Sequence, residues 1–256
     1  MAIFTGISGL LSVLVGWGVT ARLFALARRT RAVPERLLAV TFGGLFCVGY
    51  PLTGASRVPA MVMTTEGALL FAMGSIGIVV GIAALARFPY VVFRAGKRWA
   101  AALSVGIGLM GAIGGIGAAL VVAFAPTREA MIAEIQPWTI ALMASVGASF
   151  FWNGLESVGY YGKMKKRAAL GLSNPETTHR FLLWAVASFA SVALIAAIMT
   201  IRITGLPILA PLGASLISCA SLLNTGCWWL AFFMPDAYRH RVLGIEPEAN
   251  AAEGAA

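Results

Sequence analysis

A single glutamate interrupts a long apolar stretch of the chain, at a point where it could carry or hold a charge. Glu156 lies seven residues before Lys163, so on a helix its carboxylate stands roughly 10 Å inside the boundary marked by the lysine. An ionised carboxylate at that depth needs a counter-charge, water or a proton. Arg22 lies at a similar depth in the first apolar stretch. We therefore predict that Glu156 pairs with Arg22 or faces a water-filled cavity; the alternative is that neighbouring hydroxyls hold Glu156 while Arg22 extends to the boundary.

Polar side chains recur every three or four residues around Glu156, which places them on one face of a helix. They are Ser145, Ser149, Asn153, Glu156 and Tyr160. A second polar line near the end of the chain contains Ser221, Asn224 and Trp228. Such residues commonly form hydrogen bonds between membrane helices. The functional hypothesis is that the two lines face each other across a ligand cavity lined by Asn153, Glu156, Tyr160, Asn224 and Trp228.

The motifs of catalysis and of cofactor binding are missing from the sequence. The patterns of zinc proteases, serine hydrolases and phosphate-binding loops are absent. The three cysteines form no CxxC pair, which is atypical of a disulfide framework or a zinc site. We therefore expect no enzyme activity, no cofactor and no metal site.

The composition indicates a membrane protein. Hydrophobic residues make up 59% of the 256-residue chain and charged residues 11%, whereas soluble domains carry about 25% charged residues. The net charge of +9 is better explained by basic loops against anionic lipid headgroups than by nucleic acid. We expect the bilayer, and no nucleic acid, as the partner of this charge.

Seven apolar runs are long enough to cross a membrane, which takes about 20 residues. We therefore predict an all-α, seven-transmembrane-helix bundle over residues 1–236 and a disordered tail over 237–256. Pro126 and Pro137 bracket the expected gap between the fourth and fifth spans. The expected spans are residues 3–27, 36–56, 65–87, 98–124, 137–162, 176–203 and 207–234.

The basic residues predict the orientation of these spans. All but three of the 19 Lys and Arg residues flank the connections after the first, third and fifth spans or follow the last span. The other side holds only Arg57, Arg128 and Arg202. Because basic loops stay in the cytoplasm, we expect the N-terminus outside and the C-terminus in the cytoplasm. The Ala- and Gly-rich composition indicates a multi-pass protein of a bacterial cytoplasmic (inner) membrane.

The connection between the fifth and sixth spans has a basic, helix-ending pattern. The helix is expected to continue through KMKKRAAL, stop at Gly171 and restart at Asn174 and Pro175. Its basic residues are candidates for contact with lipid or a protein partner: Lys163, Lys165, Lys166 and Arg167. Residues 160–184, YYGKMKKRAALGLSNPETTHRFLLW, resemble the corresponding loop in a group of uncharacterised bacterial seven-helix membrane proteins. That resemblance implies the fold and assigns no function.

Glycines at four-residue spacing predict close helix packing. They are Gly77 and Gly81 in the third span and Gly111 and Gly115 in the fourth. Such spacing lets helix backbones approach closely. We expect packing within the chain, with a homodimer face as the alternative.

Three better-known classes of membrane protein do not fit the residues. Microbial rhodopsins need a lysine in the seventh helix for retinal, and residues 207–234 contain none. Small sugar transporters carry matching prolines in their repeats, and residues 3–27 have no proline. Haem proteins need deep histidines, whereas His179 and His240 lie at the cytoplasmic edge of the predicted spans.

Three function hypotheses remain. The first is a receptor-like or sensor protein that binds a small or lipidic ligand and signals through its basic loops to a partner. The second is a small-molecule or proton-coupled transporter with Glu156 as the titrating group. The third is a structural or assembly subunit of a membrane complex.

Overall fold

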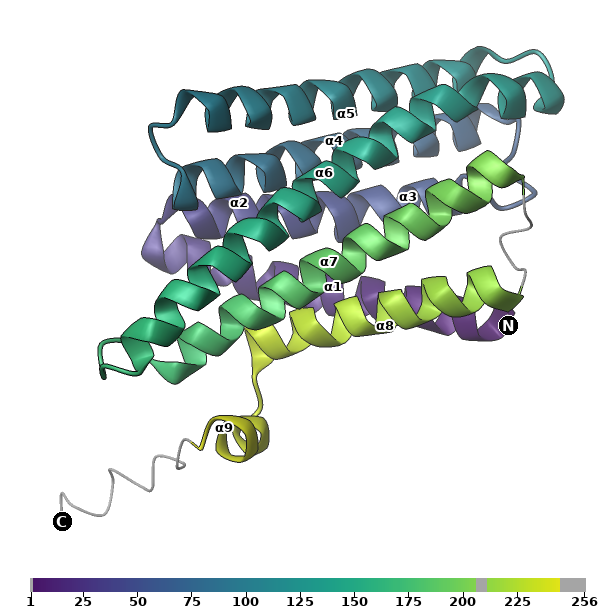
Figure 1. Ribbon diagram of the computed structural model, residues 1–256. Coiled ribbons are helices and arrows are strands. Elements are labelled where there is room, and N and C mark those ends of the chain that lie inside the picture. The colour runs from purple at the N-terminus through teal and green to yellow at the C-terminus, as the bar shows by residue number, and fades with distance from the viewer. Residues whose placement is uncertain (1, 206–210, 245–256) are drawn as a thin grey trace.

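The computed structural model describes residues 2–205 and 211–244. The described residues form helices and short connections, and no strand occurs among them (Figure 1). The elements are α1 (Ala2–Thr30), α2 (Val33–Phe42), the π-helix η1 (Gly43–Gly49), α3 (Tyr50–Ala55), α4 (Thr65–Phe93), α5 (Arg98–Phe124), α6 (Arg128–Ala168), α7 (Pro175–Thr204), α8 (Pro211–Phe233) and α9 (Asp236–Leu243).

Six helical segments of the described chain are long and apolar enough to cross a membrane. They are α1, the continuous run Val33–Ala55, α4, α5, α7 and α8. The protein is therefore a multi-pass helical membrane bundle. The long helix α6 is not among these six; its buried face carries serines, an asparagine and a glutamate, and both of its ends are charged.

The helices form a ring in which neighbours in the sequence are also neighbours in space. Contacts run from α1 to α2, from α2, η1 and α3 to α4, and on through α5, α6 and α7 to α8. The ring closes because α8 packs against α1, and α4 also contacts α6 across it (Figure 1). The connections α1–α2, α4–α5 and α6–α7, with α9, lie at one end of the bundle, here called the basic end. The α3–α4 and α5–α6 connections lie at the opposite end.

Glycines bring the second and third spans into backbone contact. A Cβ atom on Gly44 would lie 2.6 Å from the carbonyl oxygen of Gly77, and one on Gly81 would lie 3.0 Å from that of Thr41. No side chain could fit there, so the prediction that Gly77 and Gly81 serve close packing within the chain is confirmed. Gly44 and Thr41 flank the start of η1, a rare π-helical segment.

The predicted gap between Pro126 and Pro137 is wrong, because α6 already begins at Arg128. The Thr127 side chain caps it by accepting a hydrogen bond from the Ala130 amide at 3.2 Å. Pro137 lies inside α6, where a missing N–H frees a backbone carbonyl. Membrane helices tolerate proline, and α6 continues through Pro137 without a break; the nearby Thr139 hydroxyl donates to the carbonyls of Ile135 and Gln136.

The connection from α6 to α7 follows the prediction. Helix α6 extends to Ala168, and Gly171 then adopts a φ of 69°, the left-handed conformation that suits glycine. The Asn174 side chain caps α7 by accepting from the Glu176 amide at 2.8 Å, with Pro175 as the first helical residue. The two long helices are thus joined by a short turn.

The predicted disordered tail is wrong in its first part. Residues 236–243 form α9, which begins after Pro235 and ends at Gly244 with a φ of 63°. Arg239 of α9 pairs with Glu176 of α7 at 3.0 Å, and the Tyr238 hydroxyl and the His179 ring form a 2.7 Å hydrogen bond. These contacts hold α9 against the bundle. Residues 245–256 lie outside the described residues.

Candidate functional site

The polar face of α6 is buried, as its spacing predicts. Ser145, Ser149 and Asn153 are fully buried, and Glu156 is 9% exposed. Ser145 faces α5, because a Cβ on Gly111 would meet its Oγ at 2.9 Å. Asn153 faces α7, where its Nδ2 donates to the Ser188 hydroxyl at 3.0 Å. Ser145 and Asn153 of this face therefore make contacts with the two neighbouring helices α5 and α7.

Glu156 pairs with Arg94, so the predicted pair with Arg22 is wrong. The Arg94 Nε donates to the Glu156 Oε1 at 2.7 Å, and the Trp152 indole donates to the same oxygen at 3.3 Å. Arg94 follows the last residue of α4 and reaches back to α6. Arg22 lies elsewhere, with its guanidinium 5.1 Å from the centre of the Phe233 ring. The ring order places α4, and not α1, beside α6.

Glu156 and Tyr160 line a surface pocket at the basic end. The pocket has a volume of about 550 Å³ and opens between α5 and α6, beside the α4–α5 connection. Arg94 lies at its wall with its guanidinium 5.7 Å from the Trp99 ring. Tyr160 packs its ring between Phe93 and Phe181. Glu156 therefore faces a cavity, as predicted, and Arg94 of the same chain is its counter-ion.

Trp228 lies in an aromatic cluster. Its ring is 3% exposed and meets the rings of Phe42 and Trp184 edge to face, at centroid distances of 4.9 and 5.1 Å. This contact joins α2, α7 and α8. The predicted common cavity for Asn153, Glu156, Tyr160, Asn224 and Trp228 is therefore wrong, because these residues divide among several places in the bundle.

Asn224 lines a different cavity, the central cavity, at the heart of the ring. It has a volume of about 400 Å³ and is lined by residues of α1, η1, α3, α4, α6, α7 and α8. Its walls are mainly apolar, with hydroxyls of Ser8, Ser12, Ser191 and Ser221 among them. A volume of this size is typical of small-molecule sites. Helix α7 packs between α6 and α8, yet side chains of all three reach this cavity.

The Asn224 side chain is the polar group of the central cavity that lacks a partner. Its Oδ1 is buried and accepts no hydrogen bond from the described residues. The neighbouring hydroxyls are engaged: Ser12 Oγ bonds Ser221 at 2.9 Å and Thr225 at 2.6 Å, which ties α1 to α8. A buried acceptor without a donor costs about 1–3 kcal/mol. A ligand that donates to Asn224 would remove this cost.

The basic residues of the α6 extension are exposed. Lys163, Lys165, Lys166 and Arg167 all face solvent at the basic end, which leaves them free to contact headgroups or a protein. Among the residues that the structure describes, no group of three His, Cys, Asp or Glu side chains could hold a metal ion.

Sequence reasoning missed Arg94 and the central cavity. Arg94 looked like one of several basic loop residues, and only its short connection to α5 hinted that it lies against the helix ends. The hydroxyls of α1 that line the cavity, Ser8 and Ser12, are four residues apart. That spacing was a usable signal, because it matches the polar spacing in α8.

No family model, no curated protein and no solved structure matches the chain. The resemblance of residues 160–184 to a group of bacterial seven-helix proteins therefore stays a prediction.

Proposed function

We propose that the protein is a receptor-like sensor with a ligand site in the central cavity. The ligand is a small or lipidic molecule with a mainly apolar body and one hydrogen-bond donor. Binding would change how the helices pack and would be passed to a partner at the basic end. The proposal includes α6 as a seventh membrane span and the orientation with the N-terminus outside, in a bacterial inner membrane.

The observation that carries the proposal is the buried, unpartnered Oδ1 of Asn224 in a mainly apolar cavity of about 400 Å³. An apolar cavity alone would favour any hydrophobic molecule. The Asn224 amide adds a requirement, because only a ligand that places a hydrogen-bond donor near its Oδ1 gives that oxygen a partner. Residues from most of the ring reach the cavity, so a ligand there would contact both halves of the chain.

The signal would be passed to a partner at the basic end. The α6 extension presents Lys163, Lys165, Lys166 and Arg167 to solvent, and α6 also lines the central cavity through Leu142 and Val146. One continuous helix thus connects the ligand site with the basic extension. Anionic headgroups or an acidic face of a partner protein would match this charge.

The other two hypotheses have less support from the contacts. The transporter hypothesis used Glu156 as a proton carrier, and Arg94 supplies that carboxylate with a fixed positive partner at 2.7 Å. The assembly hypothesis used glycine faces, and those of α4 and α5 are occupied within the chain: a Cβ on Gly115 would meet Val79 at 2.7 Å. An uptake assay in vesicles and the mass of the extracted complex test these two alternatives.

Native mass spectrometry of the whole protein, extracted gently from its host, tests the ligand site. Gly9 lines the cavity and a Cβ there would meet nothing within 4 Å, so Gly9→Phe should fill the cavity and expel the bound molecule. Gly6→Phe is the matched control on the same helix, because Gly6 also has free space around it and is not part of the cavity wall. Asn224→Leu should weaken retention by about tenfold, the loss of one buried hydrogen bond.

Equal small-molecule retention in wild type, Gly9→Phe and Gly6→Phe would reject the central site. A protein partner in the same spectra would identify the output, and a mass of two chains would point to the homodimer. Single-cysteine labelling at Lys165 and at Arg128 in intact cells checks the proposed orientation, since only Arg128→Cys should react with an impermeant reagent.

A further inference from the structure

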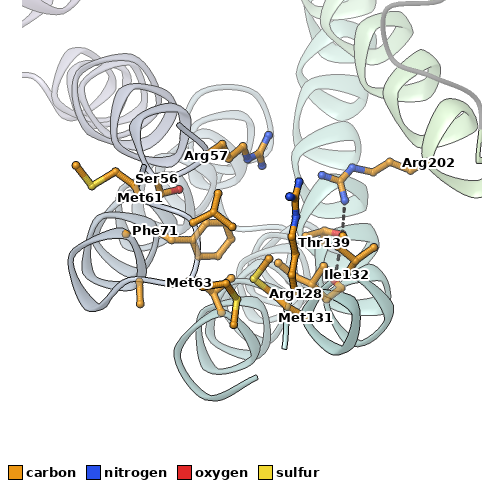
Figure 2. A pocket seen from close by; sticks show the side chains of 15 residues that line it. Ser56, Arg57, Met61, Met63, Phe71, Arg128, Met131, Ile132, Thr139 and Arg202 are labelled. Atoms are coloured by element: carbon orange, nitrogen blue, oxygen red, sulfur yellow. Dashed lines mark hydrogen bonds between the residues drawn. The ribbon is translucent and has the colours of Figure 1, made fainter. Parts of the chain in front are cut away.

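Three arginines converge on one pocket at the end of the bundle opposite the basic end (Figure 2). Arg57 follows α3, Arg128 is the first residue of α6, and Arg202 lies in the last turn of α7. Figure 2 shows their guanidinium groups pointing into the same space, which has a volume of about 350 Å³. These are the residues that the sequence placed apart from all other Lys and Arg residues of the chain.

No acidic residue lines this pocket in the part of the chain that the structure describes: none of the 15 lining residues is Asp or Glu. Among the described residues, every ion pair within 4.0 Å involves Arg94, Arg180 or Arg239, all at the basic end. The like charges of Arg57 and Arg202, which oppose each other, are therefore not offset by any ion pair among the described residues.

The local contacts leave donors unused. The Arg202 Nη1 donates to the Thr139 hydroxyl at 3.2 Å, and this bond orients the guanidinium across the pocket (Figure 2). The Arg202 Nε is buried and has no partner among the described residues. Burial and the like charge of Arg202 together lower the pKa of Arg57 below its usual value. The Nε of Arg180 and of Arg239 is unpartnered too, although both residues pair with Glu176; what distinguishes Arg57 and Arg202 is that neither has an ion pair among the described residues.

Helix ends add to the positive potential. Helix α4 and helix α6 both begin beside the pocket, whose wall includes Gly67 and Ala68 in the first turn of α4 and Arg128 at the start of α6. The N-terminus of a helix carries a partial positive charge. On the other side the wall is apolar and consists of Met61, Met63, Phe71, Met131 and Ile132, among others.

We propose that this pocket binds a phosphate group. Guanidinium groups match the geometry of phosphate oxygens and bind them through paired, charge-assisted hydrogen bonds. The apolar wall fits an organic substituent on that phosphate. Two sources share this chemistry, the headgroup of a membrane lipid and a free phosphate or phosphate ester from the aqueous side. The site is separate from the central cavity and does not depend on the proposed ligand there.

The experiment uses the whole protein, purified in a neutral maltoside detergent and freed of bound lipid. In the first arm, inorganic phosphate is titrated at constant ionic strength against chloride, and the unfolding midpoint is followed by tryptophan fluorescence. In the second arm, phosphatidylglycerol is added and the retained adducts are counted by native mass spectrometry. A response to inorganic phosphate identifies a free anion, and a response to phosphatidylglycerol alone identifies a headgroup.

Arg128→Gln is the first variant, because Arg128 is exposed and its loss should not disturb folding. We expect apparent affinity in the responding arm to fall about tenfold or more, the effect of one charge-assisted bond. Arg87→Gln is the matched control: it removes the same charge at the other end, where Arg87 lies 4.6 Å from the Tyr90 ring. It should leave binding unchanged.

Arg57→Gln adds a second signature. Without phosphate this variant should unfold at a higher temperature than wild type, because it relieves the repulsion with Arg202, and with phosphate it should lose the stabilisation. An arginine with a merely structural role would give the opposite sign without phosphate. The proposal is overturned if neither arm responds in wild type, or if Arg128→Gln and Arg87→Gln bind equally.

Discussion

The two ends of the bundle treat their arginines differently. At the basic end, Arg94 is paired with Glu156, while Arg180 and Arg239 share the carboxylate of Glu176. At the opposite end, Arg57, Arg128 and Arg202 share one pocket and have no carboxylate. In the first arrangement each of the three arginines has a carboxylate from the chain. The second has none among the residues that line the pocket, and under our proposal a phosphate group supplies the missing negative charge.

Arg94→Gln should have the largest effect on stability. It leaves the Glu156 carboxylate, which is 9% exposed, without its cation. The expected loss is about 2 kcal/mol, the desolvation cost of a charged group left unpaired, less a small recovery from the Trp152 indole. Thermal unfolding in detergent measures it.

Glu156→Gln should cost less than Arg94→Gln, because Arg94 keeps 45% of its side chain exposed and can turn to water. The double variant should be less destabilised than the sum of the two single variants. Additive losses would show that the pair contributes nothing to folding, and the contrast between the two ends would disappear.

Ile132→Glu should give the three-arginine pocket a carboxylate from the chain, as the arginines at the basic end have. Ile132 lines the three-arginine pocket and is 58% exposed, so a glutamate there avoids burial. We expect a gain of up to about 1 kcal/mol, the range of partly exposed ion pairs, together with loss of the phosphate response. Ile132→Gln is the control of similar size without the charge. A glutamate variant that still responds to phosphate would place the anion elsewhere.

Arg22→Gln should have the smallest effect. Arg22 contacts the Phe233 ring, and a cation–π contact of an exposed arginine contributes about 0.5–1 kcal/mol. Its effect should add to that of Glu156→Gln within about 0.5 kcal/mol, as for separate sites. A coupling as large as that between Arg94 and Glu156 would restore the pair predicted from the sequence.

Features that depend on one helix or one turn could be predicted from the sequence. The buried face of α6 follows from polar spacing, and the restart of α7 follows from Asn174 and Pro175, because caps and periodicity are local properties. The close approach of α4 to its neighbour follows from Gly77 and Gly81. Each of these predictions is confirmed by the contacts.

Features that depend on which helices are neighbours could not be predicted. Depth along the helices suggests Arg22 as the partner of Glu156 and gives no reason to consider Arg94; only the position of α4 beside α6 identifies Arg94. Nothing in the sequence shows that Asn224 and Glu156 line different cavities: α6 reaches the central cavity through Leu142 and Val146, while Glu156 lines the pocket beside Arg94. Pro137 suggests a helix break by the rules for soluble helices, whereas a helix within a membrane bundle tolerates an internal proline, and α6 runs through it.

The closure of the ring by α8 has a consequence for how the protein is made. Chains are synthesised from the N-terminus and fold in that order, and α8 is the last long helix to emerge. Until Ser221 and Thr225 meet Ser12, the central cavity lacks one wall and Asn224 is not yet in place. A chain released before α8 would have α1 to α7 but would lack the α8 wall of the central cavity, including Asn224. The contacts between α1 and α8 therefore form last among those of the long helices, after the rest of the ring has been synthesised.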